Sequence, residues 1–391
     1  MDIETSILTI NKGWSLIGNL RVGDIVYNSS GSQRVITRVS RNFIPPAAYK
    51  VKLNTNETFT CLPSQCWKTL TSKQVTENLQ RNPEWREKRK RKRPSRALEN
   101  PKHPAQSIAA KLNNSLRVFN YLEKNTPSFK PTDEILSTLY VRKSRKNHIM
   151  EVCASLETPD FKIPIDAYTF GAFLGDGAAV STKIIMEIRD WKKIEHLIPY
   201  KVAHEKIEGK TDNLYNRRYD GLRQDLQKVL PEYYKQSPGG KKYKVFKKII
   251  PNCIFTTSKK IRLEFLKGLM DTDGTVDKYR GRCEIGFSNY ELALGTLRLL
   301  ASLGIKSTLR EKKVKKGEKH YRMQFNSYES VFNLERKKQL QDLHPKKEYV
   351  CRRYVDEILI TEPIKMKLIE VDNGDADILV GDTLIATKFI F

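Results

Sequence analysis

Two apolar nine-residue segments, 97 positions apart, constrain the fold of this chain more than any other feature. Residues 169–177 read TFGAFLGDG and residues 266–274 read LKGLMDTDG, so each carries small residues four apart and each ends in Asp-Gly. Small residues at that spacing form a stripe on one helix face, which lets two helices pack closely. We therefore expect two adjacent helices that bring Asp176 and Asp273 together at their C-terminal ends.

The sequence around these segments also repeats. A Glu-Ile pair begins 11 residues beyond each aspartate, at positions 187 and 284, and an Ile-Pro pair precedes each segment, at 163–164 and 250–251. A period near 100 residues is too long for a solenoid repeat. It indicates two copies of a small α+β unit related by pseudo-twofold symmetry.

The two segments resemble the signature of the LAGLIDADG homing endonucleases, the second more closely than the first. Phe170 and Phe173 stand where leucine is usual, and Gly175 stands where alanine or glycine is found. The resemblance covers roughly residues 160–345. It implies fold class α+β, with a two-repeat αββαββα, pseudo-symmetric endonuclease domain that we place at residues 159–359.

The paired aspartates also predict a chemistry. Adjacent carboxylates repel each other and favour a bound divalent cation, and hard carboxylate oxygens suit Mg²⁺, with Mn²⁺ as the alternative. Phosphodiester hydrolysis needs an activated water and a stabilised leaving oxygen, which shared metal ions supply. We expect Asp176 and Asp273 to be the catalytic metal ligands, with the backbone of Gly175 and Thr272 as further ligands. A lone Asp-Gly would be an ordinary helix end, but two in matched repeats favour the site.

A basic residue in each repeat would stabilise the charge on the reacting phosphate. In the family that the chain resembles, such a lysine lies about 70 to 80 residues beyond each aspartate. Lys248 fits in the first repeat, within a Lys-x-Ile-Pro pattern. In the second repeat Lys337 and Lys338 fit a loose pattern, while Lys346 and Lys347 fit the distance better; we select Lys338.

Three further polar residues accompany the predicted site. We expect Asp190 and Asn289 to occupy secondary polar positions near the metal ions. Asp271 is expected to orient the end of the second helix and not to bind metal.

Both ends of the chain carry short alternating or β-branched runs, with turn signals at 28–31, 373–374 and 381–382. These ends resemble a Hint splicing domain of the intein type, into which an endonuclease is inserted. We therefore predict an all-β Hint-like domain from residues 1–158 plus 360–391, whose segments 1–70 and 365–391 pair. The predicted strands are 7–10, 24–27, 34–39, 49–53 and 57–61, followed by hairpins built from 367–372, 377–380 and 383–387.

The residues of the splicing reaction are replaced. The Thr-x-x-His motif of inteins matches positions 62–65, which carry Leu62 and Gln65, and the chain begins with Met1 where a Cys or Ser is needed. Lys388 and Phe389 stand where His-Asn would be. We expect splicing to be lost. The alternatives are an intein that retains some self-splicing and a catalytically inert, maturase-like protein that binds DNA or RNA.

Charge points to nucleic acid as the partner. The chain has 71 Lys and Arg against 45 Asp and Glu, a formal net charge of +26, and such an excess favours binding to a polyanion. An insertion at about 76–150 holds a basic run that we interpret as DNA-contacting, although such runs are often merely solvated or serve targeting. The predicted DNA-binding residues are Arg86, Lys88, Arg89, Lys90, Arg91, Lys92 and Arg93 in that run, and Arg310, Lys312 and Lys313 near a turn at Gly317.

The remaining features bound the setting of the protein. No run of 18 apolar residues predicts a membrane span, and the N-terminus lacks the pattern of a signal peptide. Six cysteines without a CxxC pair indicate neither a zinc site nor a disulfide framework. The sequence therefore predicts an intracellular monomer, in the cytoplasm, nucleoid or nucleus, that cleaves double-stranded DNA at a long asymmetric site.

Overall fold

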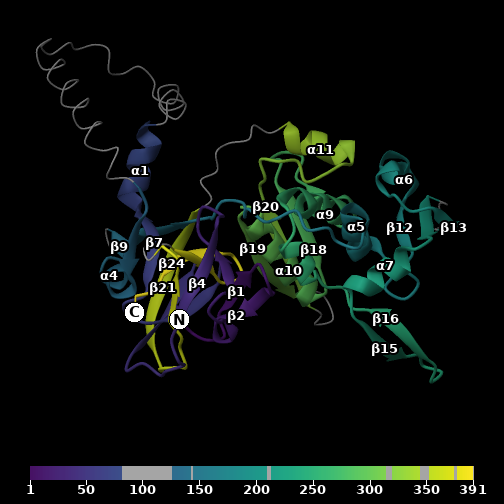
Figure 1. The fold of residues 1–391 in the computed structure, drawn as a ribbon. Coiled ribbons are helices and arrows are strands. Elements are labelled where there is room, and N and C mark those ends of the chain that lie inside the picture. Colours follow the sequence, from purple (N-terminus) through teal and green to yellow (C-terminus); the bar gives the residue numbers. More distant parts are fainter. Residues whose placement is uncertain are drawn as a thin grey trace, which may run out of the picture.

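The computed structural model describes residues 1–81, 126–141, 144–208, 213–313, 319–343, 352–373 and 377–390. A β-rich part at one end of the molecule contains both chain termini, and an α+β body adjoins it (Figure 1). The predicted α+β class is confirmed. The basic run from Arg86 to Arg93 lies outside the described residues.

The β-rich part is built from two sheets with the strand orders β2-β1-β3-β4-β22 and β23-β24-β7-β11-β21-β5-β6, where β8 also pairs with β7. The first sheet contains Ser6–Thr9 (β1), Gly13–Leu16 (β2), Ile25–Tyr27 (β3), Gln33–Val39 (β4) and Ile369–Val371 (β22). The second contains Ala48–Leu53 (β5), Thr58–Cys61 (β6), Cys66–Thr71 (β7), Ser128–Pro131 (β8), His148–Glu151 (β11), Arg352–Thr361 (β21), Ile378–Val380 (β23) and Ile385–Lys388 (β24). Smaller elements are Ile17–Asn19 (η1), Ser72–Arg81 (α1), Thr132–Ser137 (α4), Tyr140–Val141 (β9) and Arg145–Lys146 (β10).

The two ends of the chain pair as predicted. Strand β22 pairs with β4, and β24 pairs with β7, where Thr387 lies opposite Trp67. The predicted hairpin between 367–372 and 377–380 is wrong. Asp372 instead exchanges two hydrogen bonds with Val35, backbone N–H to Val35 O at 2.8 Å and Val35 N–H to its carboxylate at 2.9 Å, which ties the end of β22 to β4.

The predicted boundary at 359/360 falls inside β21. This strand pairs with β5 and β11 along its length, from Arg352 opposite Glu151 to Thr361 opposite Ala48. We therefore propose to count residues from 352 onward with the β-rich part; the division at 158/159 stays a prediction.

The α+β body contains two copies of one plan. The second repeat runs αββαββα through Lys259–Thr272 (α9), Thr275–Val276 (β17), Cys283–Phe287 (β18), Tyr290–Ser302 (α10), Ser307–Lys313 (β19), Lys319–Phe325 (β20) and Glu335–Asp342 (α11). The first follows the same order through Ala167–Asp176 (α5), Ile184–Glu187 (β12), Ile188–Ile194 (α6), Glu195–Leu197 (η2), Val202–Glu208 (β13), Leu214–Tyr219 (β14) and Leu222–Val229 (α7). A bridge from Gly177 to Ile184 takes the place of the strand equivalent to β17.

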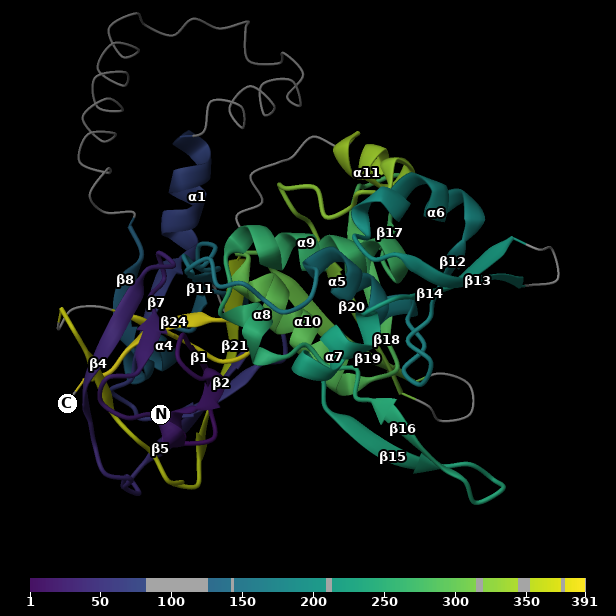
Figure 2. The same ribbon diagram turned by 45° about the vertical axis from the view of Figure 1, so that its right-hand side comes forward.

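The first repeat then adds a hairpin. Strands Glu232–Gln236 (β15) and Lys242–Phe246 (β16) form a separate two-stranded sheet before the short helix Asn252–Phe255 (α8) leads into α9. Both ribbon views show this hairpin projecting from the end of the body that is remote from the β-rich part (Figures 1 and 2).

Helices α5 and α9 approach each other closely at the predicted small residues. A Cβ on Gly171 would lie 2.0 Å from the carbonyl oxygen of Phe265, and a Cβ on Gly268 would lie 2.0 Å from that of Tyr168. These two contacts exchange under a shift of 97 positions, the spacing of the sequence repeat. The pseudo-twofold axis of the body therefore runs between these two helices.

Substitution at this contact should destabilise the body. We expect Gly268→Ala to lower the free energy of unfolding by about 2 kcal/mol or more, because a methyl group cannot fit against a backbone oxygen that both helices hold in place. Gly239→Ala is the matched control, since Gly239 has open space around it and no left-handed φ. Urea denaturation measures both; equal stabilities of the two variants would contradict the close packing.

The β-rich part is attached to the body by specific contacts. The rings of Trp14 and Phe255 meet edge to face at 5.9 Å, and the Asn252 carboxamide accepts from the backbone N–H of Trp14 at 3.1 Å. Arg298 on α10 binds the carboxylate of Asp382 at 2.8 Å. Among the described residues, no helix combines the length and the apolar character needed to cross a bilayer.

Candidate active site

The predicted aspartates come together where α5 and α9 end. Helix α5 ends at Asp176, and Asp273 is the C-cap of α9. A Cβ on Gly175 would lie 2.0 Å from Oγ1 of Thr272 and 3.4 Å from the carboxyl carbon of Asp273. A side chain at 175 would have to displace Thr272, so the small-residue stripe also sets the separation of the two carboxylates.

Burial acts on both carboxyl groups of this pair, and like charge acts in addition on Asp273. Burial, followed by the charge of Asp176, raises the pKa of Asp273 to about 6, while Lys248 and Lys337 oppose the change. Burial also raises the pKa of Asp176, against the same two lysines. A divalent cation between the carboxylates would relieve both costs.

Lys248 is positioned at the end of α5. Its Nζ donates to the carbonyl oxygen of Gly175 at 2.6 Å, and its own carbonyl accepts from Nδ2 of Asn289 at 2.8 Å. Burial lowers the pKa of Lys248, opposed by the charges of Asp273 and then Asp176. The sequence prediction for the first repeat therefore matches the position of this ammonium beside the carboxylate pair.

In the second repeat the structure places Lys337, and not the selected Lys338, at the equivalent position. Lys337 is buried, and its Nζ donates to the carbonyls of Met270, Asp271 and Gly274 at 3.1, 2.7 and 2.7 Å. Burial lowers the pKa of Lys337 to about 8. Lys338 is half-buried and makes none of these three bonds.

The sequence contains a helical pattern that distinguishes Lys337 from Lys338. Leu334, Lys337 and Gln341 are spaced as one face of a helix, and all three are buried. Lys338 lies about 100° around α11 from that face. Lys346 and Lys347 lie outside the described residues.

Asp271 and Asp190, like Asn289, have structural partners. Asp271 accepts from the Tyr168 hydroxyl at 2.8 Å and from the backbone N–H of Leu334 at 3.1 Å, as expected for a residue that orients the helix end. The Asp190 carboxylate binds the Arg336 guanidinium through two bonds, at 2.9 and 2.5 Å. Asp190 thus ties α6 of the first repeat to α11 of the second, and we assign it to positioning α11 and Lys337.

The donors at this site fit a hard cation better than a soft one. Two carboxylates and the backbone oxygens of Gly175 and Thr272 are all oxygen ligands, which suit Mg²⁺ and Mn²⁺. Within the described ranges, no group of three or more His, Cys, Asp or Glu side chains gathers at one place. An ion at the pair would therefore complete its shell with water and substrate oxygens.

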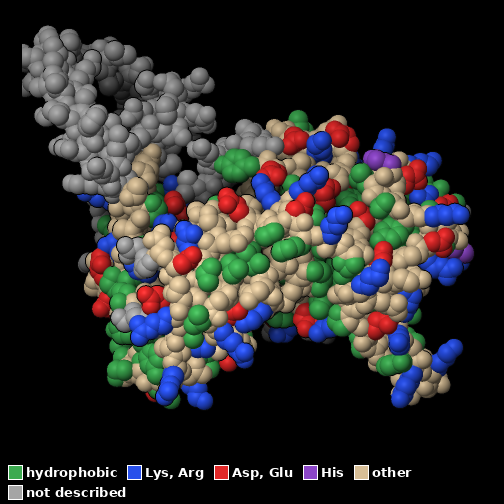
Figure 3. Space-filling model, viewed as in Figure 1, with side chains coloured by type: hydrophobic (Ala, Val, Ile, Leu, Met, Phe, Trp, Pro, Cys, Tyr) green, Lys and Arg blue, Asp and Glu red, His purple; other side chains and the backbone are tan. Residues whose placement is uncertain are grey.

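The predicted DNA-contacting residues of the second repeat lie on β19. Arg310 is exposed and pairs with Arg322 of β20, and Lys312 is exposed opposite His320. Lys313 ends the strand, and the predicted turn at Gly317 falls outside the described residues. Basic side chains are distributed over much of the visible face (Figure 3).

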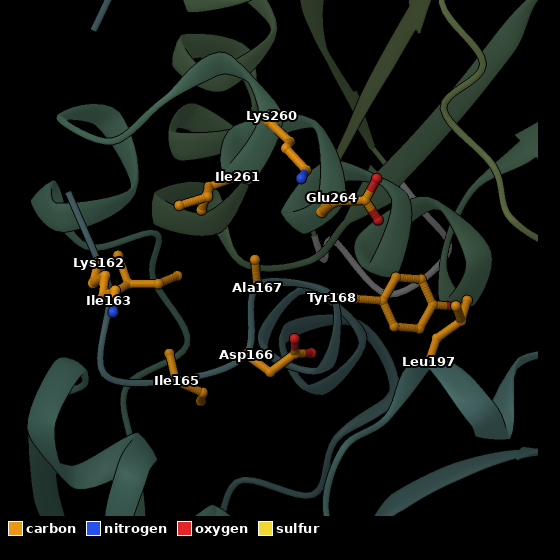
Figure 4. A pocket seen from close by; sticks show the side chains of 10 residues that line it. All are labelled: Lys162, Ile163, Ile165, Asp166, Ala167, Tyr168, Leu197, Lys260, Ile261 and Glu264. Carbon is orange, nitrogen blue, oxygen red and sulfur yellow. The ribbon is translucent and has the colours of Figure 1, made fainter. Parts of the chain in front are cut away.

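A cavity of about 380 Å³ lies at the opposite, N-terminal ends of α5 and α9. Figure 4 shows residues from both helices and the segment preceding α5 lining it, among them Asp166, Tyr168, Lys260 and Glu264. It does not include either aspartate of the pair. We place the chemistry at the C-terminal ends and not in this cavity.

Gln65 is held by the last strand of the β-rich part, β24. Nε2 of Gln65 donates to Oγ1 of Thr387 at 2.7 Å and to the carbonyl oxygen of Lys388 at 2.9 Å. The backbone oxygen of Gln65 accepts from the Thr132 hydroxyl at 2.9 Å. Gln65 therefore serves as a structural tie between β24 and the loop before β7.

Comparisons with known proteins agree with this arrangement. A family model described as a LAGLIDADG-like domain matches residues 260–342, the span of the second repeat from α9 to α11. A curated relative, the replicative DNA helicase DnaB of Mycobacterium intracellulare, is 23% identical over 388 residues, which cover 96% of this chain and 56% of that protein. The chain thus spans a little over half the length of this relative.

Solved structures resemble separate parts of the chain. The MchDnaB-1 intein is 19% identical and covers 18% of this chain and 53% of its own, with a TM-score of 0.17. The homing endonuclease I-DmoI in complex with DNA and Mn is 18% identical and covers 41% of this chain and 89% of its own, with a TM-score of 0.28. Residues 260–342 are therefore similar to a LAGLIDADG-like domain, and the chain as a whole resembles an arrangement in which such a domain is embedded in an intein-type Hint domain.

Proposed function

We propose that this chain is a site-specific endonuclease that cleaves double-stranded DNA with a divalent cation, Mg²⁺ or Mn²⁺. The observation that carries the proposal is the convergence of Asp176 and Asp273 at the ends of two closely packed helices, where burial raises the pKa of both carboxyl groups and the charge of Asp176 further raises that of Asp273. A protein retains two such costly carboxylates where an ion or substrate compensates them.

Each residue has a role in the proposed hydrolysis. Asp176 and Asp273 would hold the ion, which when bound would supply Lewis-acid polarisation and lower the pKa of an attacking water. Lys248 and Lys337 present ammonium groups beside the pair, one from each repeat, and these stabilise negative charge developing on the phosphate. We propose Lys337 in place of Lys338 for the second repeat.

The proposed substrate follows from charge and from the duplication. A net charge of +26 favours the DNA backbone, and two non-identical repeats in one chain supply two different half-sites. We therefore propose a monomer that binds a long, asymmetric duplex site, and a DNA substrate implies that the protein acts inside the cell. Arg310 and Lys312 on β19 are proposed to contact DNA from the second repeat, together with Lys313 and the basic run.

We also propose that splicing is lost. An intein histidine at position 65 would exchange a proton, whereas the Gln65 amide does not titrate and is engaged by Thr387 and Lys388. Expression of the chain between two unrelated proteins tests this alternative on a denaturing gel. A ligated product that lacks the chain would contradict the proposal.

One experiment tests the endonuclease proposal directly. The protein is incubated with a randomised duplex library in Mg²⁺, in Mn²⁺ or in EDTA, and the cut ends are sequenced. We expect one recurrent site, cut only with metal, and no cutting by a variant that carries both Asp176→Asn and Asp273→Asn. Duplex binding without metal-dependent cutting would overturn the proposal in favour of an inert DNA-binding protein.

A further inference from the structure

The β15–β16 hairpin is the element of the first repeat that the αββαββα plan does not require. It follows α7, projects from the end of the body remote from the β-rich part, and forms a sheet of its own (Figures 1 and 2). The second repeat has no such projection among its described residues. An addition of this kind needs an explanation other than the fold.

Both faces of the hairpin interleave aromatic and basic side chains. Tyr234 lies opposite Lys244 on one face, and Lys235 lies opposite Tyr243 on the other. Tyr234 is 66% exposed and Tyr233 is 41% exposed. Exposed aromatic surface is unfavourable in the free protein, so these tyrosines indicate a surface that a partner covers.

The charge of the hairpin selects the partner. Its exposed lysines are Lys235, Lys241, Lys242 and Lys244. Its acidic residue, Glu232, sits at the base and is bound by Arg223 at 2.7 Å. The outer part therefore carries no acidic side chain, and its charged side chains are all lysines, which is complementary to a polyanion (Figure 3).

The base of the hairpin is fixed to the candidate active site. The backbone N–H of Phe246 donates to Ala179 O at 3.0 Å, and its ring meets that of Phe173 on α5 edge to face, with centroids 6.2 Å apart. The backbone N–H of Lys247 donates to Pro231 O at 2.8 Å, and the next residue is Lys248. A two-stranded hairpin is only marginally stable by itself, so this attachment is what holds it in a defined position.

We propose that the β15–β16 hairpin is a DNA-gripping ribbon that extends the contacted duplex beyond the first half-site, on the side away from the β-rich part. This rests on the proposed DNA substrate. A two-stranded ribbon fits a groove of the duplex, its lysines reach phosphates on the two sides, and its tyrosines pack against sugar and base edges. In Figure 1 the second repeat lies next to the β-rich part, the first repeat lies beyond it, and the hairpin projects beneath the first repeat; in Figure 2 the hairpin again projects below the body.

The test compares two double variants of equal charge. Lys235→Ala with Lys242→Ala removes two lysines from the hairpin, and Lys192→Ala with Lys193→Ala removes two exposed lysines from α6, which packs against β12 and β14. Binding of a mixed-sequence duplex is measured by fluorescence anisotropy in EDTA across a range of salt concentrations. We expect the hairpin variant to lose about tenfold in affinity and about 1 to 2 units of salt slope, because each lost phosphate contact lowers the slope by about 1. The α6 variant should match the wild-type protein.

Equal binding by the hairpin variant and the wild-type protein would overturn the proposal, and it would leave a protein partner as the explanation of the exposed tyrosines. Because binding is measured without metal, this outcome is independent of cleavage. A wild-type protein that binds duplex but never cuts it would refute the proposed endonuclease activity and leave the ribbon intact. On a cleaved target, the hairpin variant should also lose footprint protection at one end only, whereas an even loss at both ends would contradict the placement.

Discussion

Asp176→Asn and Asp273→Asn will each abolish double-strand cleavage, with a loss of about 10³-fold or more, while leaving DNA binding within a few fold of the wild-type protein. A loss of that size corresponds to about 4 kcal/mol of transition-state stabilisation. It is expected because an amide is a weak metal ligand, whereas the α5–α9 contact depends on glycines and not on these carboxylates. Single-turnover cleavage and anisotropy on the same target measure the two effects. Cutting at the wild-type rate by both variants would refute the assigned site.

The Asp273→Asn substitution should also stabilise the metal-free protein. The pKa of Asp273 is about 6 in the folded protein, against an ordinary value of 3.8. Between these two pH values the carboxyl group is ionised in the unfolded chain but stays protonated in the folded one. The carboxyl therefore lowers stability progressively as the pH rises from about 4 to about 6, and the full cost persists above that range. We expect Asp273→Asn to gain about 1 to 2 kcal/mol at pH 7.5 in EDTA, a figure reduced for the solvent that screens a half-buried group. The gain should vanish below pH 4 in urea denaturation.

If Asp273→Asn is no more stable than the wild-type protein at pH 7.5, the Asp273 carboxylate is well solvated or paired in the metal-free protein. Added Mg²⁺ supplies the control. It should raise the stability of the wild-type protein by mass action and leave Asp273→Asn unchanged.

Lys337→Met will slow cleavage by about 10²-fold, whereas Lys338→Met will change it less than about threefold, because transition-state charge stabilisation by one donor is commonly worth about 10² to 10³ in rate. The two residues are adjacent on α11, so the pair separates the buried ammonium from general effects on the helix. Lys337 also holds three backbone carbonyls at the end of α9. A purely structural role would lower the stability and leave the pH dependence of the residual activity unaltered.

The pH profile distinguishes these roles. Lys337 has a pKa lowered to about 8, so its ammonium is present below that pH and is lost above it. The wild-type rate should therefore rise through about pH 6, as Asp273 ionises, and fall above about pH 8. Lys337→Met should lose the fall at high pH, and more metal should move the rise to lower pH. A Lys337→Met profile with the wild-type alkaline limb would contradict a catalytic ammonium.

Local patterns in the sequence were sufficient for the helix pair and for most strands. Small residues four apart determine how closely two helices approach, and alternating β-branched runs determine strands, because both depend on neighbours within a few residues. The spacing of 97 residues then related Gly171 to Gly268 and Asp176 to Asp273 before any contact was known. The predicted strands at both ends were found for the same reason, whereas the pairing of those ends was predicted from the resemblance to a Hint domain.

Tertiary structure decided the features that depend on partners distant in the chain. Lys337 is distinguished from Lys338 by carbonyls at the end of α9, more than 60 positions earlier, and Asp190 is bound by Arg336, 146 positions later. Strand β22 pairs with β4 because Asp372 meets Val35. The β15–β16 hairpin acquires its direction from Ala179 and Phe173, which hold its base. A one-dimensional pattern shows which side chains can be buried or charged, but only the packed chain determines which of several equivalent lysines, carboxylates or strands reaches a given place.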